Sequence, residues 1–401
     1  MRFALGPTGH WGVAQLAERP AVYREGAGSN PAAPALRREI RTLHRPGPEG
    51  TSLLSVAASG ECRVEEYTGT PAEWDRLVST FPGGSHCHLY GWREVMEGAL
   101  GHECFYLSAI DEADQVVALL PLGRVKSRVF GDYLVSMPFL NGGGAIGSLE
   151  GCRSLEVHAR ELATRLDVEL LELRSRRASA DSGLTLCARK ITVELSLPGD
   201  LQVLWKGFHQ KLRANINKAK KAGMEMRYGA DQVAPFYKAF AHNMRDLGTP
   251  VLPLRFFQAI ARTLPEHVVF GALWAGNRPV AGQCAFVFGD TLEMVWGSSV
   301  REYNRLKVTS HIHWAFIERA SRAGCRTFDF GRCTEGSGTH QFKQQWGGVD
   351  TPLPWGQFSP SGRDSTPSPD RPLYRAAVSV WKRLPLAVTN RIGPLLARSL
   401  P

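Results

Sequence analysis

The segment 328–348, FDFGRCTEGSGTHQFKQQWGG, gathers charged side chains around glycines in an arrangement suited to an anionic ligand. Asp329 stands in a strand-like pattern between two phenylalanines, which face the opposite side of that strand. Arg332 follows, beside a loop in which Gly336 and Gly338 allow positive φ and the close approach of a ligand. The pattern therefore predicts a binding site just beyond the end of a strand.

Lys343 comes after this loop, in what should be a short helix or strand. Together with Arg332 it can neutralise a phosphate, or the oxyanion that forms when an amine attacks a carbonyl carbon. The glycine and lysine spacing is not that of a Walker P-loop, so a nucleoside triphosphate cradle is not predicted. The alternative interpretation is a buried Asp–Arg pair with a lysine that extends to solvent.

A second basic feature lies in the helical pattern 204–223, where apolar residues recur at every fourth position. The stretch 206–227 has seven basic residues against one glutamate, a net charge of +6. Such a face attracts phosphates of a nucleotide-linked ligand or of RNA, with Lys211 and Arg213 as candidate contacts. A solvated helix face without a ligand is the alternative interpretation. The basic residues are Lys206, Lys211, Arg213, Lys218, Lys220, Lys221 and Arg227.

The common catalytic signatures GxSxG, HExxH, the P-loop and GxGxxG after an opening strand do not occur. The eight cysteines include no CxxC pair, which argues against zinc or a disulfide framework and favours reduced thiols. The pairs His86/His88 and His311/His313 have no ligand cluster nearby in sequence, so structural or surface roles are predicted. We therefore expect no metal and no bound cofactor, and a site that works by positioning and electrostatics.

The chain of 401 residues, with 43% hydrophobic and 21% charged residues, is long enough for two domains and tails. No apolar run approaches the roughly 18 residues of a membrane-spanning helix. The N-terminus lacks the apolar region of a secretion signal. These features predict a cytoplasmic protein.

The elements that position the charged residues begin at Cys62 and repeat in order. The first part predicts strand 62–68, helices 71–82 and 85–102, hairpin 105–125, strand 127–147, helix 152–166, and strands 168–175 and 188–197. The second predicts helices 204–223, 234–248 and 255–265, three strands within 268–299, helix 308–325 and strand 327–331. The shared order suggests a duplicated α/β domain.

The two ends of the chain differ from this pattern. Residues 1–60 are rich in Ala, Gly, Pro and Arg, and 12–34 look like the translation of a tRNA gene, so we expect a disordered or spurious extension. The stretch 359–372 reads as a Pro/Ser linker. Residues 373–401 have five basic residues and no acidic one among apolar residues. This tail is predicted either to lie on an anionic membrane surface or a partner, or to pack on its own domain.

Several segments together resemble the FemAB-related proteins associated with PEP-CTERM/exosortase systems. They cover roughly residues 62–401 and are HLYGWREVMEGALGHECFYLSA, LPLGRVKSRVFGDYLVSMPFLNGGG, NMRDLGTPVLPLRFF, FGDTLEMVWGSSVREYNRL, FDFGRCTEGSGTHQFKQQWG and WKRLPLAVTNRIGPLLARSLP. The resemblance implies an α/β (α+β) fold of two tandem GNAT-like acyltransferase domains, with mixed sheets flanked by helices. The implied domains are 61–198 and 199–358, followed by the linker 359–372 and the tail 373–401.

The resemblance also implies roles for single residues. Lys343 of the Phe-Lys motif is expected at a substrate phosphate or the transition state. Tyr303 and Asn304 of REYNRL, like Asp329 and Arg332 of DFGR, match positions expected at the cleft. The coiled-coil arm that FemA-type enzymes use for tRNA is not found here. The acetyl-CoA turn Q/RxxGxG/A is replaced by REYNRLKVTS, which leaves longer acyl-CoA donors open.

We expect an N-acyl or aminoacyl transferase in which an amine attacks an activated ester or thioester. Lys343 and backbone N–H groups would stabilise the oxyanion, and Glu335, Asp329 or a water would accept the proton. FemAB proteins transfer amino acids from aminoacyl-tRNA to a peptidoglycan precursor, so the expected acceptor is an envelope precursor or an exopolysaccharide-related amine. The donor, acyl-CoA or aminoacyl-tRNA, stays open, as does the oligomeric state.

Two other classes of function compete with the transferase. One is a non-catalytic adaptor that contacts the inner face of the plasma membrane through 373–401 and a polyanion through 206–227. The other is a plain RNA-binding protein, which is less well supported because the basic helix lacks interleaved aromatic residues.

Overall fold

The computed structural model describes the chain in four stretches, to which every structural statement below refers: residues 62–127, 130–176, 182–362 and 372–400. The predicted N-terminal extension, residues 1–60, lies outside them, as does most of the predicted linker. Among the described helices, none is both long enough and apolar enough to cross a membrane.

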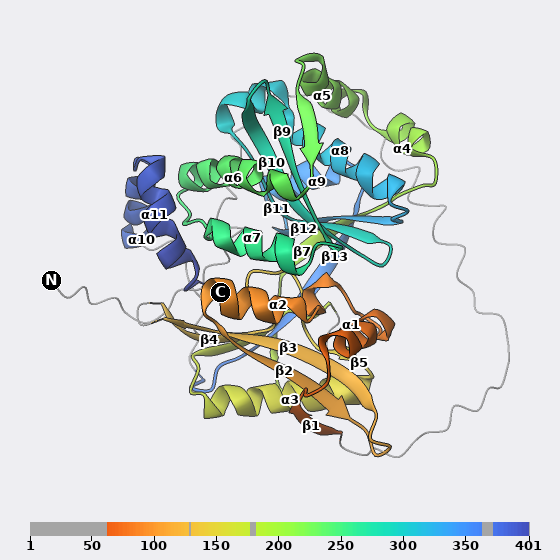
Figure 1. Cartoon of the computed structure of the whole chain (residues 1–401), viewed down its shortest axis with the longest axis vertical. Helices are drawn as coiled ribbons and strands as arrows, with labels where there is room; N and C mark the ends of the chain where they lie inside the picture. The colour runs from red at the N-terminus through yellow and green to blue at the C-terminus, as the bar shows by residue number, and fades with distance from the viewer. Residues whose placement is uncertain (1–61, 128–129, 177–181, 363–371, 401) are drawn as a thin grey trace. The chain divides into compact units, whose positions relative to one another are not determined.

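The described strands form one mixed sheet of thirteen strands (Figure 1). Their order across the sheet is β1-β2-β3-β4-β6-β13-β7-β12-β11-β10-β9-β8, with β5 beside β3. The strands are β1 (Arg63–Glu66), β2 (Glu103–Ile110), β3 (Val116–Ser127), β4 (Gly131–Val135), β5 (Ile146–Gly147), β6 (Leu170–Leu173), β7 (Thr185–Ser196), β8 (Glu225–Tyr228), β9 (Val268–Ala275), β10 (Arg278–Phe288), β11 (Thr291–Ser299), β12 (Thr327–Thr334) and β13 (Val349–Phe358).

Helices flank this sheet, so the predicted fold class of mixed sheet and helices is confirmed (Figure 1). α3 packs on β2 and β3, whereas α6 and α8 pack on β10 and β11. The helices are α1 (Pro71–Thr80), η2 (His86–His88), α2 (Gly91–Glu94), η3 (Val95–Leu100), α3 (Leu149–Arg165), α4 (Leu201–Gly207), α5 (Gln210–Lys221), η4 (Ala230–Gln232), α6 (Val233–Leu247), α7 (Leu254–Thr263), η5 (Arg301–Leu306), α8 (Val308–Arg322), α9 (Gly338–Gln344), α10 (Pro372–Trp381) and α11 (Leu386–Ala397).

Local sequence signals explain where several helices begin. Thr70 and Glu73 form a capping box at the start of α1, where Pro71 occupies the first turn. Ser148 accepts a hydrogen bond from the Gly151 N–H and begins α3. These caps satisfy N–H groups that a helix cannot pair internally, so the start of each helix is encoded locally.

Two of the predicted helices are wrong in detail. The pattern 204–223 forms two helices, α4 and α5, because Phe208 and His209 take extended backbone conformations between them. The break buries Phe208 edge-on against Trp346, with ring centroids 5.5 Å apart. The pattern 85–102 becomes the 3-10 turn η2, the short α2 and the π-helical η3. In both places tertiary packing outweighs helical periodicity.

The last strand of each half of the chain lies in the sheet beside the other half. We call residues 62–198 the first half and 199–358 the second half. β7 of the first half pairs antiparallel with β12 of the second. β13 of the second half pairs antiparallel with β6 of the first, and β7 and β13 pair with each other between them. The halves therefore share one hydrogen-bonded sheet, and a domain boundary at 198 stays a prediction.

The central strand β13 was not predicted from the sequence, because Pro352 and Pro354 argue against a central strand. The pairing of β13 with β7 shifts register between Leu353 and Trp355, so Pro354 lies at the irregularity. A proline is tolerated there because no ladder N–H is required of it.

A short repeat links the two halves at β13. β6 and the residue after it read LLELR, and β12 contains FDFGR. The guanidinium carbons of Arg174 and Arg332, which close these two motifs, lie 4.8 and 4.6 Å from the ring centroid of Trp355. Each half thus places one arginine on the same buried tryptophan, an arrangement that is favourable for the electrostatics of the ring.

We expect Trp355→Ala to lower the free energy of unfolding by about 3–5 kcal/mol, because it removes a buried ring that contacts arginines from both halves. Urea unfolding followed by circular dichroism measures the change. Val349→Ala, at a 70% exposed position of the same strand, is the matched control and should change it by less than about 0.5 kcal/mol. Equal effects of the two substitutions would contradict the role of Trp355.

Candidate active site

Three carboxylates stand in register on three adjacent strands of the sheet. Glu293 of β11 is paired with Asp329 of β12 in the parallel ladder. Asp329 is paired with Glu194 of β7 in the antiparallel ladder. Directly paired residues project from the same face of a sheet, so the three side chains form a row, which we call the carboxylate row. Like charges in this arrangement repel each other and require a cation.

Arg176 supplies that cation. One terminal nitrogen donates to Glu194 Oε1 at 2.9 Å, and the other donates to Glu293 Oε2 at 3.2 Å and Asp329 Oδ2 at 2.8 Å. Burial by itself lowers the pKa of Arg176, but the carboxylates of Asp329 and Glu293 outweigh it and raise the pKa above its ordinary value. The guanidinium is therefore a permanent charge that holds three strands to the segment following β6.

Asp329 lies at the centre of the row and is fully buried. Its Oδ1 accepts hydrogen bonds from the Thr192 hydroxyl and from the Gly331 N–H, the latter at 2.8 Å. Burial, followed by the neighbouring charge of Glu293, raises the pKa of Asp329 above its ordinary value. Gly331 has a φ of +73°, and a Cβ there would meet the Met294 carbonyl oxygen at 2.1 Å, so this close approach of β12 to β11 requires glycine.

Glu293 has two further partners, both from the first half of the chain. His86 Nε2 lies 3.1 Å from its Oε2, and Asn141 donates to its Oε1 at 2.7 Å. Burial raises the pKa of Glu293, but the hydrogen bond and charge of His86, with Arg176 and Asn141, lower it to about 2. The ring of His86 also stacks on Phe286, with centroids 4.4 Å apart.

The pKa of His86 is raised in turn. Burial lowers it, but Cys87 and Glu293 outweigh burial and raise it to about 10. His86 is therefore protonated at neutral pH. The three carboxylates of the row therefore have two basic partners, Arg176 and His86.

The row opens to solvent at one end only. The side chains of Glu194 and Arg176 are 31% and 30% exposed, whereas those of Glu293 and Asp329 are 4% and 0% exposed. Glu194 also accepts from the Thr351 hydroxyl at 2.9 Å. Glu194 is thus the carboxylate of the row that an incoming molecule can reach.

The row also marks the place where two parallel strands stop pairing. The parallel ladder between β11 and β12 ends at Glu293 and Asp329, although both strands continue. Just beyond, β11 shifts register against β10, and Val295 is the extra residue of a bulge. Regular pairing of the backbone therefore ends beside the carboxylate row.

His86, Cys87 and Glu293 are the one group of three potential metal ligands that the described residues bring within 4.8 Å. Sequence spacing gave no sign of it, because Glu293 lies 207 positions from His86. Cys87 Sγ is almost equidistant from the two ring nitrogens, at 3.9 and 3.7 Å. The contacts within this group are that of the His86 ring with the Glu293 carboxylate and that of the Cys87 sulfur with the same ring.

Lys343, predicted to face the substrate, is buried. Its ammonium donates to the backbone carbonyls of Gly331 at 2.6 Å and Arg332 at 3.0 Å. α9, which carries Lys343, is capped by Ser337, whose hydroxyl accepts from the His340 N–H. These bonds fasten α9 to β12 directly after Asp329 and indicate a positioning role. Contact of Lys343 with a transition state stays a prediction.

The other predicted residues of the glycine loop do not lie in the carboxylate row. Arg332 is buried against Trp355. Glu335 and Gly336 are exposed, and the Gly336 N–H donates to His340 Nδ1 at 2.9 Å. Gly338 is the first residue of α9. Of the predicted residues of this segment, the structure brings Asp329 alone into the carboxylate row.

The remaining predicted residues lie in the elements around α8. Tyr303 and Asn304 are in η5, before α8, where Tyr303 is half-buried and the Asn304 side chain accepts from the Ser299 hydroxyl at 2.8 Å. Lys211 and Arg213 are in α5, which packs against α8 and η5. Lys211 is exposed and Arg213 is half-buried.

Sequence reasoning missed two carboxylates of the row, Glu194 and Glu293, and three partners of the row, Arg176, His86 and Asn141. One signal was present, since the LELRSR stretch that ends in Arg176 resembles FDFGR around Asp329. The triple-glycine turn was a second signal. A Cβ on Gly144 would meet Ser175 Oγ at 2.3 Å, so glycine there lets the turn approach the segment that carries Arg176.

Comparisons with known proteins agree with this fold. Residues 206–344, which are 139 of the 401 residues, match the family model "Acetyltransferase (GNAT) domain". Curated protein sequences gave no match. The match contains β8 to β12 and α9, and hence Glu293, Asp329 and Lys343, whereas Arg176 and Glu194 lie before it.

Solved structures extend the likeness beyond that domain. The chain is similar to FemX with a TM-score of 0.58 and 14% identity, over 74% of this chain and 97% of the FemX chain. The C-terminal domain of a putative lysylphosphatidylglycerol synthetase from Agrobacterium fabrum gives 0.48 and 13%, over 65% and 85%. A tandem GNAT protein from the clavulanic acid biosynthesis pathway gives 0.43 and 13%, over 75% and 100%. Of these three, the FemX score alone supports an argument, and it shows a GNAT-type acyltransferase fold.

We expect the ion pair of His86 and Glu293 to make stability depend on pH. The folded-state pKa of His86, about 10, exceeds its ordinary value of 6.5. The contribution of the His86 ion pair to the free energy of unfolding is therefore complete below pH 6.5 and is lost as the pH rises through about 10. His86→Gln should cost about 3 kcal/mol near pH 6 and progressively less toward pH 10. Urea unfolding across this range tests it, with His158→Gln as control. A pH-independent cost would contradict the ion pair.

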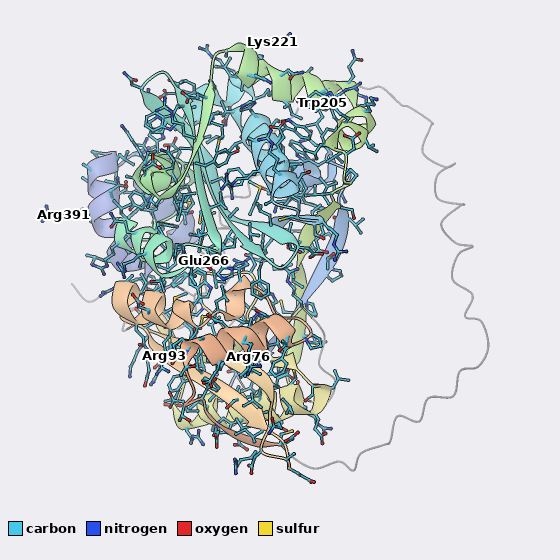
Figure 2. The ribbon with its side chains drawn as sticks, turned by 45° about the vertical axis from the view of Figure 1, so that its right-hand side comes forward. Arg76, Arg93, Trp205, Lys221, Glu266 and Arg391 are labelled. Carbon is cyan, nitrogen blue, oxygen red and sulfur yellow. The ribbon has the colours of Figure 1, made fainter. Side chains whose placement is uncertain are left out.

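We expect Lys343→Met to lower the free energy of unfolding by about 1–3 kcal/mol, because the carbonyls of Gly331 and Arg332 lose a buried donor. Lys221→Met, at an exposed position of α5 (Figure 2), is the control and should be nearly neutral. Denaturant unfolding and turnover are measured on both variants. Unchanged stability with strongly reduced turnover would instead assign Lys343 to the transition state.

Proposed function

We propose that this protein is an N-acyl or aminoacyl transferase in which the carboxylate row receives the amine of the acceptor. The proposal rests on one observation. The row lies where β11 and β12 of the matched acetyltransferase domain stop pairing, and it gathers three carboxylates around two basic side chains, with Glu194 at its open end. An ammonium group is the natural counter-ion for such a site.

The reaction requires the acceptor to attack as a neutral amine. A lone pair on its nitrogen forms a bond to the acyl carbon, and the bond from that carbon to the donor's oxygen or sulfur breaks. We propose that Glu194 accepts the amine proton, because it is the one carboxylate of the row with substantial exposure. Arg176 orients Glu194 through its 2.9 Å hydrogen bond. Backbone N–H groups beyond Glu293 are the proposed oxyanion donors.

We propose that the acyl or aminoacyl donor binds at a group of basic side chains on α5 and η5. Four lysines of α5 are exposed, and α5 packs against η5 and the start of α8. η5 adds Arg301 and Arg305, both exposed, and Lys307 precedes α8. This combination suits a donor with phosphates, either a long acyl-CoA or an aminoacyl-tRNA. The lysines are Lys211, Lys218, Lys220 and Lys221.

The acceptor is proposed from the resemblance to FemAB-related proteins. An amine of a peptidoglycan-like precursor or of an exopolysaccharide-related molecule fits a row that selects for positive charge. An association with PEP-CTERM/exosortase systems belongs to the same proposal. The sequence motifs support it, and the fold likeness to FemX is compatible with it.

We expect Glu194→Gln to reduce kcat by about 100-fold or more, because glutamine can still accept from Arg176 and can donate to the Thr351 hydroxyl but cannot accept a proton. The assay incubates the full chain with acetyl-CoA, long-chain acyl-CoA or aminoacyl-tRNA and a set of amines. Mass spectrometry then detects the amide product. The rate below the optimum should also lose its pH dependence in the variant.

Glu161→Gln, at an exposed position of α3, is the matched control and should keep full activity. Equal unfolding free energies for wild type and Glu194→Gln would confirm that the fold is intact. Full activity of Glu194→Gln would remove this residue from the mechanism. Failure of every donor class to yield an amide would overturn the proposed reaction itself.

A further inference from the structure

The C-terminal helices α10 and α11 form a separate feature beside α6 (Figure 1). Arg245 of α6 donates to the Leu384 carbonyl, between the two helices, at 3.3 Å. Ala397 and Leu400 are buried in the same apolar cluster as Met244 and Val251. The tail therefore packs on the second half of the chain, as one of its two predicted alternatives stated.

α11 has two faces of different character. Thr389, Gly393 and Ala397 recur every fourth residue and are buried. On another side of the helix, Val388, Ile392 and Leu395 are 37%, 42% and 61% exposed. Their spacing of four and three residues aligns them along the helix axis. We call Val388, Ile392 and Leu395 the apolar row. Because α11 already packs on the protein through its other face, exposed apolar residues of this kind indicate a second binding partner.

Basic residues border this apolar row. Arg391 and Arg398 are exposed and follow Val388 and Leu395 by three residues, so each lies beside the row. Figure 2 shows Arg391 pointing away from the rest of the protein. Residues 373–401 contain five basic residues and no acidic one. Val380 of α10, 59% exposed, adds to the apolar surface.

We propose that the exposed face of α11, with Val380 of α10, docks on the surface of an anionic lipid bilayer. The apolar row would enter the boundary between headgroups and acyl chains, and the arginines would contact lipid phosphates. A second copy of this chain fits less well, because a symmetric dimer through this face would bring like charges together. A nucleic acid would satisfy the arginines but leave the apolar row in water. This docking is independent of the proposed acyl transfer.

The test is flotation of the full chain with vesicles of mixed phosphatidylglycerol and phosphatidylcholine, against pure phosphatidylcholine. We expect binding to the mixed vesicles, weakened by salt. The triple variant Val388→Ser/Ile392→Gln/Leu395→Gln should lose it. The double variant Arg391→Gln/Arg398→Gln should bind at least about tenfold more weakly, since each arginine near an anionic surface contributes several-fold.

Two matched controls keep the test specific. Leu149→Gln removes an apolar side chain that is 84% exposed on α3, and Arg76→Gln removes an exposed arginine of α1 (Figure 2); both should bind like wild type. Unchanged thermal unfolding of the tail variants shows that α11 still packs on α6. Failure to bind the mixed vesicles, binding equal on both vesicle types, or a dimer that the triple variant abolishes would each overturn the proposal.

Discussion

Arg176 is the residue on which the centre of this structure depends, because one guanidinium donates hydrogen bonds to carboxylates from three adjacent strands. Without it, Glu293, Asp329 and Glu194 would face one another as like charges, two of them with almost no solvent to screen them. Arginine suits this role because its planar fork offers several donors in fixed directions and keeps its charge when buried. The carboxylates of Glu293 and Asp329, which lie inside the matched acetyltransferase domain, are thus held by Arg176, which lies outside it.

The exchange of β7 and β13 explains how residues from both halves of the chain reach one place. β7 contributes Glu194 to the row, although it belongs to the first half, and β12 contributes Asp329 from the second. β13 lies between β6 and β7 and places Trp355 under an arginine from each half. A site assembled in this way requires both halves, because neither contains the row together with its counter-ion.

Side chains of opposite charge are separated in this structure. The three carboxylates of the row lie on β7, β11 and β12, whereas exposed lysines lie on α5 and exposed arginines on η5; the proposed acyl transfer would use this separation. The tail also has two different faces. One face of α11 packs on the protein through small residues, and another face exposes larger apolar residues and arginines. In the carboxylate row and in α11, the buried side chains stabilise the fold, and the exposed side chains are the ones that a ligand or a membrane surface can reach.

The sequence by itself determined the elements that obey short-range rules: capped helices such as α1, the hairpin of β2 and β3, and the strand that puts Asp329 opposite two phenylalanines. It also indicated the basic character of α5 and of the tail. Only the tertiary structure decided that Lys343 binds backbone carbonyls, that proline-containing β13 is central, and that Arg176 and His86 meet Glu293. The reason is physical. Capping and periodicity act within a few residues, whereas a charge finds its partner through strand register, which links positions up to 207 residues apart.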